Sequence, residues 1–139
     1  MKLSVKSDYA TRAVFALARH YQQGEARRIE DLAKEHHIPA SYLVQILIEL
    51  KSKQIVKSQR GKDGGYLLAR HPSEITLGDM LRAVHGQVFD TPALADPHAP
   101  PELRAAWRKL QKSLEGAADS ITFQQLIEQS LGREKMYYI

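Results

Sequence analysis

Apolar side chains recur three and four residues apart over most of the chain, the spacing of amphipathic helices. The first such stretch covers residues 8–22, with Ser7 as a candidate N-cap and Gly24 as a candidate stop. A second covers residues 29–37, and a third runs from about residue 41 to residue 53. The predicted buried stripe of the third helix consists of Leu43, Ile46, Leu47 and Leu50.

Two short apolar runs, residues 55–58 and 66–69, follow the third helix directly and are flanked by glycine or charge. The segment between them, QRGKDGG, contains three glycines, so several of its positions can adopt a positive φ. The pattern predicts a β-hairpin with a basic tip. His37, in the turn between the second and third helices, is expected to adopt left-handed geometry.

The second half of the chain begins with Thr76 and Asp79, spaced as a capping box for a helix that ends near His85. Residues 86–101 hold four of the six prolines and are predicted to form a loop. Thr122 and Gln125 predict the start of a last helix, residues 123–131.

Between the loop and the last helix, residues 101–118 are predicted to form a long helix that ends or bends at Gly116, because glycine weakens a helix interior. Its apolar stripe is heptad-like and consists of Leu103, Trp107, Leu110, Leu114, Ala117 and Ile121. The predicted fold is mainly α with a small β-hairpin: a winged helix-turn-helix domain (1–85), a Pro-rich loop (86–101), and a dimerisation helix with a C-terminal helix (102–139).

Composition narrows the possible functions. The 139 residues carry a net charge of +4 and no cysteine, which excludes disulfides, thiolate metal sites and cysteine nucleophiles. Residues 1–72 carry 13 Lys/Arg and 7 Asp/Glu, whereas residues 73–139 carry 7 and 9, so the basic half coincides with the predicted winged helix. A solvated basic surface explains the charge alone equally well.

Neither a membrane span, a signal-peptide layout nor a common enzyme motif is present, which predicts a cytoplasmic protein that is not an enzyme. The six histidines show no ligand spacing, so no metal or other cofactor is predicted.

A third helix lying in a major groove would present its N-terminal residues to base edges. Gln45 could pair with an adenine edge and Val44 could pack on a thymine methyl group, while the hydroxyls of Ser41 and Tyr42 would hold phosphates. The alternative for these two is that Tyr42 is partly core and Ser41 only a cap.

The hairpin tip offers a second set of candidate DNA contacts. Its Arg and Lys side chains suit a narrow minor groove, and its glycines allow close approach of the backbone to phosphates. These residues are Lys57, Arg60, Gly61, Lys62, Gly64 and Gly65.

Four segments, MKLSVKSDYATRAVFALA, IPASYLVQILIELK, SQRGKDGGYLLAR and ITLGDMLRAVHG, resemble the Rrf family of bacterial winged-helix regulators, the IscR/NsrR/CymR type. The resemblance implies a homodimer on a partly palindromic operator. Family DNA contacts would map to Ser4, Lys6 and Tyr9 in addition to the third helix and the wing. The dimer interface would lie on the long helix, with Leu103, Trp107, Leu110 and Leu114.

Members that hold an iron–sulfur cluster place three cysteines in the segment matching residues 86–105, which has none here. Some members have a glutamate at the position of Val44, so operator preference is expected to differ.

We therefore expect a DNA-binding transcriptional regulator, more specifically a repressor. Two alternatives stay open. One is a protein-interaction module that docks through the Pro-rich loop and the YYI tail; the other is a small-ligand sensor with a pocket between the wing domain and the dimer helix.

Overall fold

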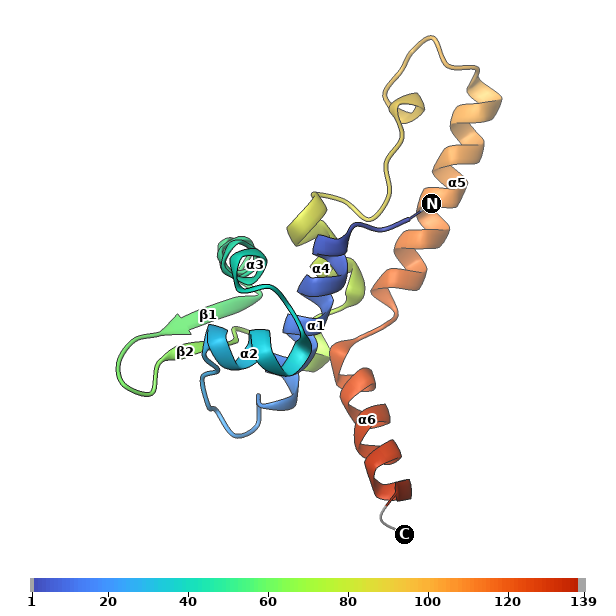
Figure 1. Ribbon diagram of the computed structural model, residues 1–139. Coiled ribbons are helices and arrows are strands. Elements are labelled where there is room, and N and C mark those ends of the chain that lie inside the picture. Colours follow the sequence, from blue (N-terminus) through green and yellow to red (C-terminus); the bar gives the residue numbers. More distant parts are fainter. Residues whose placement is uncertain (1, 138–139) are drawn as a thin grey trace.

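The computed structural model describes residues 2–137, except for the side chain of Tyr137. Helices make up most of it, and a two-stranded hairpin projects to one side (Figure 1). This confirms the predicted fold class. The elements are α1 (Val5–Arg19), α2 (Ile29–His36), α3 (Ala40–Ser52), β1 (Val56–Gln59), β2 (Gly65–Leu68), η1 (Pro72–Glu74), α4 (Leu77–His85), η2 (Pro92–Leu94), α5 (Pro101–Asp119) and α6 (Phe123–Tyr137).

Helix α1 lies at the centre and packs against α3, α4, α6 and β2 (Figure 1). Its small side chains Ala10 and Ala13 are completely buried and let the neighbouring helices approach closely. The predicted cap of this helix is wrong by three residues. Ser4 has extended backbone and its hydroxyl accepts the N–H of Ser7, whereas Ser7 is already helical. The helix also ends earlier than predicted, at Arg19.

The second and third helices lie within one residue of their predicted bounds. His37 joins them in left-handed geometry with φ 54°, as predicted, and the following Ile38 is buried in the core. All four residues of the predicted α3 stripe are buried. The single αL residue His37 ends α2 and turns the chain, so that α3 can begin only a few residues later. This is a tight helix-turn-helix.

Strands β1 and β2 pair antiparallel, with Val56 opposite Leu68 and Gln59 opposite Gly65. Each strand is shifted by one residue from its predicted range. The outer edge of β2 carries one further pair: Arg27 and Tyr66 exchange backbone hydrogen bonds of 2.7 and 2.8 Å. The connection between α1 and α2 is thereby attached to the wing.

Both predicted capping boxes form. The Thr76 hydroxyl accepts the Asp79 N–H at 3.0 Å and the Asp79 carboxylate accepts the Thr76 N–H at 3.0 Å. Thr122 and Gln125 exchange equivalent bonds of 3.2 Å at the start of α6. The predicted helix end at Gly116 is wrong, because α5 continues through it to Asp119. The last helix is also longer than predicted and reaches Tyr137.

The predicted Pro-rich loop contains the short helix η2 and runs back along α5 (Figure 1). Phe89 stacks on Trp107 with ring centroids 6.0 Å apart. The Gln111 side chain donates to the Phe89 carbonyl at 3.1 Å, and Arg104 donates to the carbonyls of Asp96 and Ala99 at 3.0 Å each. The loop is therefore fastened to α5 by side chains of that helix.

Candidate nucleic-acid interface

Helix α3 has one buried and one exposed side. The exposed side carries Ser41, Tyr42, Val44 and Gln45, the four residues predicted to contact DNA. Tyr42 is 50% exposed and Val44 is 42% exposed. Ser41 is not the helix cap, because the cap position is occupied by Pro39. The alternative reading of Ser41 as a cap is therefore wrong, and Tyr42 is not a core residue.

Tyr9 of α1 lies against Tyr42 of α3 in a T-shaped contact, with ring centroids 5.5 Å apart. The Arg12 guanidinium lies 5.8 Å from the centroid of the Tyr9 ring and forms an ion pair of 2.8 Å with Asp8. The structure thus brings Tyr9 and Tyr42 together. It also adds Arg12, which sequence reasoning missed although it lies three residues after Tyr9 and four after Asp8.

The other two residues predicted at the start of the chain have partners within the protein. The Ser4 hydroxyl caps α1 and lies 3.1 Å from Nε2 of His85, which also contacts the hydroxyl of Ser7. The Lys6 ammonium group lies 2.6 Å from the Glu49 carboxylate on α3. Lys6 is therefore positioned beside α3, and its positive charge is partly neutralised there.

The wing supplies exposed positive charge at its tip. Arg60 and Lys62 are exposed there, and Gly61 lies between them. Lys57 is also exposed, but it lies within β1 opposite Leu67 and not at the tip where it was predicted. Lys51, at the end of α3, donates to the Ser58 hydroxyl of β1 at 2.8 Å and so connects the third helix to the wing. The Arg28 guanidinium donates to the Lys62 carbonyl, which adds another arginine beside the tip.

Two of the wing glycines are required by the fold itself. A Cβ atom at Gly65 would lie 2.3 Å from the Arg27 carbonyl oxygen, and one at Gly64 would lie 2.4 Å from the Gln59 carbonyl oxygen. Gly61 meets nothing within 4 Å but has φ 108°, which favours glycine. Close packing of the wing is therefore sufficient by itself to require glycine at positions 64 and 65.

Ile48 is an exposed residue that sequence reasoning did not select. It lies one helical turn after Val44 and is 52% exposed. Applying the four-residue spacing once more along α3 would have found it.

Comparisons with known proteins agree with this geometry. Residues 3–129 match the model of a family described as Rrf2, iron-dependent transcriptional regulator. The chain belongs to the Rrf2 family. It is 32% identical over 131 residues to the HTH-type transcriptional regulator IscR of Serratia proteamaculans, covering 91% of this chain and 79% of that protein. It is 29% identical over 137 residues to CymR of Bacillus subtilis, covering 99% and 97%.

Solved structures of Rrf2-type regulators have the same fold. The T. potens IscR structure matches with a TM-score of 0.78 at 31% identity, covering 94% of this chain and 88% of that one. The B. subtilis CymR structure, described as the global cysteine regulator, matches with a TM-score of 0.81 at 26% identity, covering 93% and 98%. This Rrf2 chain is thus a DNA-binding helix-turn-helix transcriptional regulator and not an enzyme.

The iron dependence in the family description can be tested against the ligands that this member offers. The sequence has no cysteine, so it lacks the thiolates that hold iron–sulfur clusters. Among residues 2–137, no three His, Asp or Glu side chains are grouped to hold a metal ion. The residues present do not fit a thiolate-bound cluster.

In this Rrf2 chain, α5 buries no side chain completely within the protomer. Leu103 is 56% exposed and Leu110 is 42% exposed, whereas Leu114 is half-buried and Trp107 is covered on one side by Phe89. An exposed apolar stripe on a long helix is typical of a surface that pairs with another helix.

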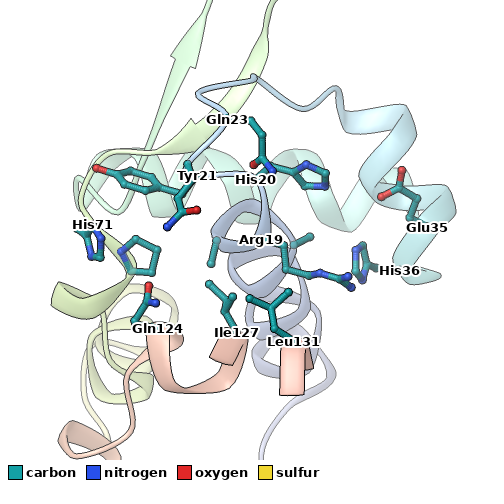
Figure 2. Close-up of a pocket in the computed structure, with 14 residues that line it drawn as sticks. Arg19, His20, Tyr21, Gln23, Glu35, His36, His71, Gln124, Ile127 and Leu131 are labelled. Atoms are coloured by element: carbon teal, nitrogen blue, oxygen red, sulfur yellow. The ribbon is translucent and has the colours of Figure 1, made fainter. Parts of the chain in front are cut away.

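A cavity of about 360 Å³ lies between the ends of α1 and α2 and one side of α6 (Figure 2). His20 and His36 line one side of it, with Arg19 nearby, and His71 lies at the other side beside Tyr21. Burial lowers the pKa of both His20 and His36 from the usual histidine value, and in His20 the nearby Arg27 charge lowers it further.

Within the described part of the chain, no helix is both long and apolar enough to cross a bilayer.

Proposed function

We propose that this protein binds a partly palindromic operator as a homodimer and represses transcription without an iron–sulfur cluster. The main support for this proposal is the outer face of α3, where Val44 and Gln45 are exposed while the opposite stripe of the same helix is buried in the core. A helix held rigidly by its core side can present fixed hydrogen-bonding and apolar groups to base edges. The basic wing tip supplies the charge for a neighbouring phosphate backbone or minor groove.

In the proposed complex the residues have separate tasks. Gln45 and Val44 read bases, and Ser41 and Tyr42 contact phosphates. The proposed phosphate and groove contacts outside α3 are Ser4, Lys6, Tyr9, Lys57, Arg60, Gly61, Lys62, Gly64 and Gly65. The Tyr9–Tyr42 contact supports joint action of α1 and α3 on one DNA strand, because it holds both rings at the same edge of the domain.

A homodimer is proposed because α5 leaves an apolar stripe exposed along a helix of 19 residues. Pairing this stripe with its twin removes apolar surface from water. A symmetric dimer presents two copies of α3, which suits two half-sites about one helical turn apart.

The test is selection of duplexes from a random pool, followed by titration of the best sequence at several salt concentrations. We expect enrichment of an inverted repeat and an affinity that falls steeply with salt, as phosphate contacts require. Gln45→Ala should weaken binding by about 1–3 kcal/mol and relax preference at one base pair per half-site. Gln129→Ala, an exposed glutamine on α6, is the matched control. Recovery of no sequence preference would refute the operator proposal.

Repression is tested separately, with a reporter gene whose promoter carries the selected operator. Expression should fall when the regulator is present and recover with Gln45→Ala. A rise in expression with the wild-type chain would instead identify an activator.

Sensing of a small polar effector is the second candidate role, and the histidine-lined cavity favours it, although this cavity adjoins α6 and not the wing domain and α5, where the pocket was expected. Its test is a thermal-shift screen of polar metabolites, with His36→Ala as the control that should abolish any shift.

A protein partner is the remaining alternative, tested by co-purification. Of the YYI tail predicted to dock it, residues 138–139 and the side chain of Tyr137 lie outside the described residues.

A further inference from the structure

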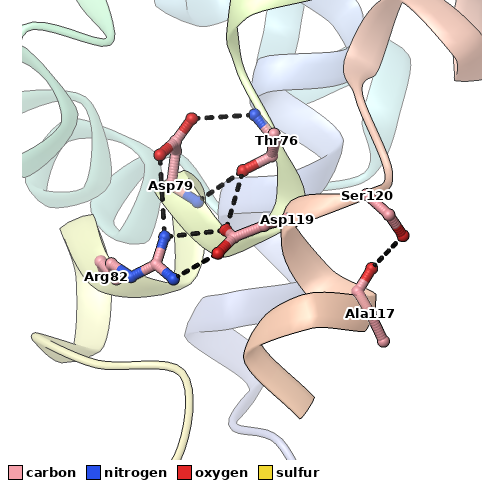
Figure 3. Close-up of polar contacts among 6 residues, drawn as sticks. All are labelled: Thr76, Asp79, Arg82, Ala117, Asp119 and Ser120. Atoms are coloured by element: carbon pink, nitrogen blue, oxygen red, sulfur yellow. Dashed lines mark hydrogen bonds and ion pairs between the residues drawn. The ribbon is translucent and has the colours of Figure 1, made fainter. Parts of the chain in front are cut away.

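The C-terminal end of α5 is fastened to the start of α4 by a two-pronged ion pair. Arg82 donates to both carboxylate oxygens of Asp119, at 2.9 and 2.8 Å (Figure 3). Asp79, in the first turn of α4, lies 3.8 Å from the same guanidinium. The Thr76 hydroxyl donates to Asp119 at 3.4 Å. The last residue of α5 thus contacts the cap residue of α4 and an arginine from its second turn.

Gly78 permits this approach. A Cβ atom at that position would lie 2.0 Å from a carboxylate oxygen of Asp119 and 3.0 Å from the Arg82 guanidinium. Any larger residue would force the Asp119 carboxylate and the Arg82 guanidinium out of their present positions, and so would disturb the ion pair. The Arg82–Asp119 ion pair in its present position therefore depends on glycine at position 78.

Backbone hydrogen bonds hold the next residues in the same place. The Leu77 N–H donates to the Ile121 carbonyl at 3.0 Å, and the Phe123 N–H donates to the Ile75 carbonyl at 3.0 Å. Phe123 is completely buried. The turn between α5 and α6 is thus attached to the segment that precedes α4, and α6 is anchored in the core.

Beyond this junction, α5 projects from the winged-helix part, and η2 in the loop of residues 86–100 packs beside it (Figure 1). A helix of 19 residues is about 28 Å long at 1.5 Å per residue, so a tilt of roughly 10° at its base moves its far end by about 5 Å. That displacement exceeds the rise of one DNA base pair, about 3.4 Å. The junction is consequently where a small change would have the largest effect on a dimer built through α5.

The Arg82–Asp119 ion pair contributes little to the stability of the fold. Both charged side chains are about 40% exposed, and ion pairs at such positions contribute little to folding. A bidentate arginine–carboxylate pair does, however, fix the relative orientation of the two helices that carry it. Both groups stay charged at neutral pH, because the hydrogen bonds from Arg82 lower the pKa of Asp119 and the hydrogen bonds to Asp119 raise the pKa of Arg82.

We propose that Arg82 and Asp119, with Gly78, are positioning residues that fix the direction in which α5 leaves the winged-helix part, and thereby the operator half-site spacing that the dimer accepts. This inference rests on the proposed operator-binding homodimer. It predicts that loosening the junction leaves each α3 able to read its half-site but removes the preference for one spacing.

The first experiment measures the geometry without DNA. Because the chain has no cysteine, Lys53→Cys and Lys112→Cys give two unique spin-label sites, one at the end of α3 and one on α5. Labelled chains diluted with unlabelled ones report the distance within one protomer. We expect a narrow distribution in the parent chain and a broad or shifted one in Asp119→Asn and in Gly78→Ala. The matched control is Glu102→Gln, which removes an exposed acidic charge in the first turn of α5, at the opposite end of the helix from the junction.

The second experiment titrates the same chains, without labels, against operators whose half-site spacing is changed by one base pair in either direction. Asp119→Asn should lower the affinity ratio between the best and next spacing about fivefold, equivalent to about 1 kcal/mol. Affinity for an isolated half-site should not change. A lost fold would lower both affinities, so the ratio separates positioning from stability.

An unchanged distance distribution in Asp119→Asn would overturn the proposal, as would an unchanged spacing preference. If Gly78→Ala does not fold, Asp119→Asn alone decides. Failure of the parent chain to bind any duplex would refute the proposed function instead, and the distance measurement would still decide whether the junction fixes α5.

Discussion

Arg60 is exposed and directly follows β1, in the turn that joins the two strands of the wing. Arg60→Ala removes a planar charged group proposed to enter a narrow groove, so operator binding should weaken by about 1–3 kcal/mol. Fluorescence anisotropy titration measures this. Arg133→Ala, at an exposed position of α6, removes the same charge and should leave affinity nearly unchanged. Equal losses in the two variants would refute a specific role for Arg60.

Gly65 has a structural role that can be measured separately from DNA binding. A methyl group there would collide with the Arg27 carbonyl oxygen and break the backbone pairing of Arg27 with Tyr66. We expect Gly65→Ala to lower the free energy of unfolding by about 1–3 kcal/mol in urea titrations. The control is Gly132→Ala, inside α6 with nothing within 4 Å, which should stabilise by up to about 1 kcal/mol.

Single residues differ in how far the sequence predicts their surroundings. Gln45 and Val44 were correctly placed on an exposed face, because helical spacing relates them to the buried Leu43 and Ile46. The partner of Lys6 could not be predicted. Glu49 lies 43 residues later in the chain, and only the packing of α1 against α3 brings the two charges together.

Whole elements were predicted well where local chemistry defines them. The αL turn at His37 and both capping boxes fixed the starts or ends of α2, α4 and α6. Helix α1 was predicted three residues late, because Ser4 and Ser7 are both plausible caps in the local sequence; in the structure Ser4 caps the helix by accepting the Ser7 N–H. The attachment of residues 86–100 to α5 was missed because it depends on Phe89 reaching Trp107.

The ends of α1 and α2 give the fold a pH dependence. Burial lowers the pKa of His20 and His36, with nearby Arg27 and Arg19 also lowering both and Glu35 opposing them. The folded chain therefore keeps these imidazoles neutral at a pH where the unfolded chain already binds protons. The free energy of unfolding should fall as pH decreases from about 7 to about 5, since unfolding then takes up protons.

Urea titrations at several pH values measure this slope. His36→Gln should make it shallower, because one of the two depressed imidazoles is gone. His98→Gln, at an exposed position in the loop of residues 86–100, is the control and should leave the slope as it was. A slope unaffected by His36→Gln would show that other groups produce the dependence.

The two halves of the molecule carry net charges that suit the two tasks proposed for them. The half with excess positive charge contains α3 and the wing, and the half with excess negative charge contains α5 and α6. Opposite net charges favour binding of the DNA phosphates to the first half over the second. The long helix is then free to pair with a second copy without competing for the same phosphates.

This division predicts a variant that folds but does not dimerise. Leu110 is 42% exposed on α5, so Leu110→Glu places its charge in solvent in the monomer but inside the proposed dimer interface. Analytical ultracentrifugation should show a monomer, while the thermal midpoint of the winged-helix part changes little. Affinity for the full operator should fall by at least about 10²-fold, because two linked half-sites become independent.

Lys112→Glu is the control for that variant. By helical spacing it lies on the opposite side of α5 from Leu103 and Leu110, and it is exposed. It changes the charge by more than Leu110→Glu does, yet it should remain dimeric. A dimeric Leu110→Glu chain would place the interface elsewhere. A monomeric one that kept full operator affinity would show that one winged helix suffices, and the palindromic operator would have to be abandoned.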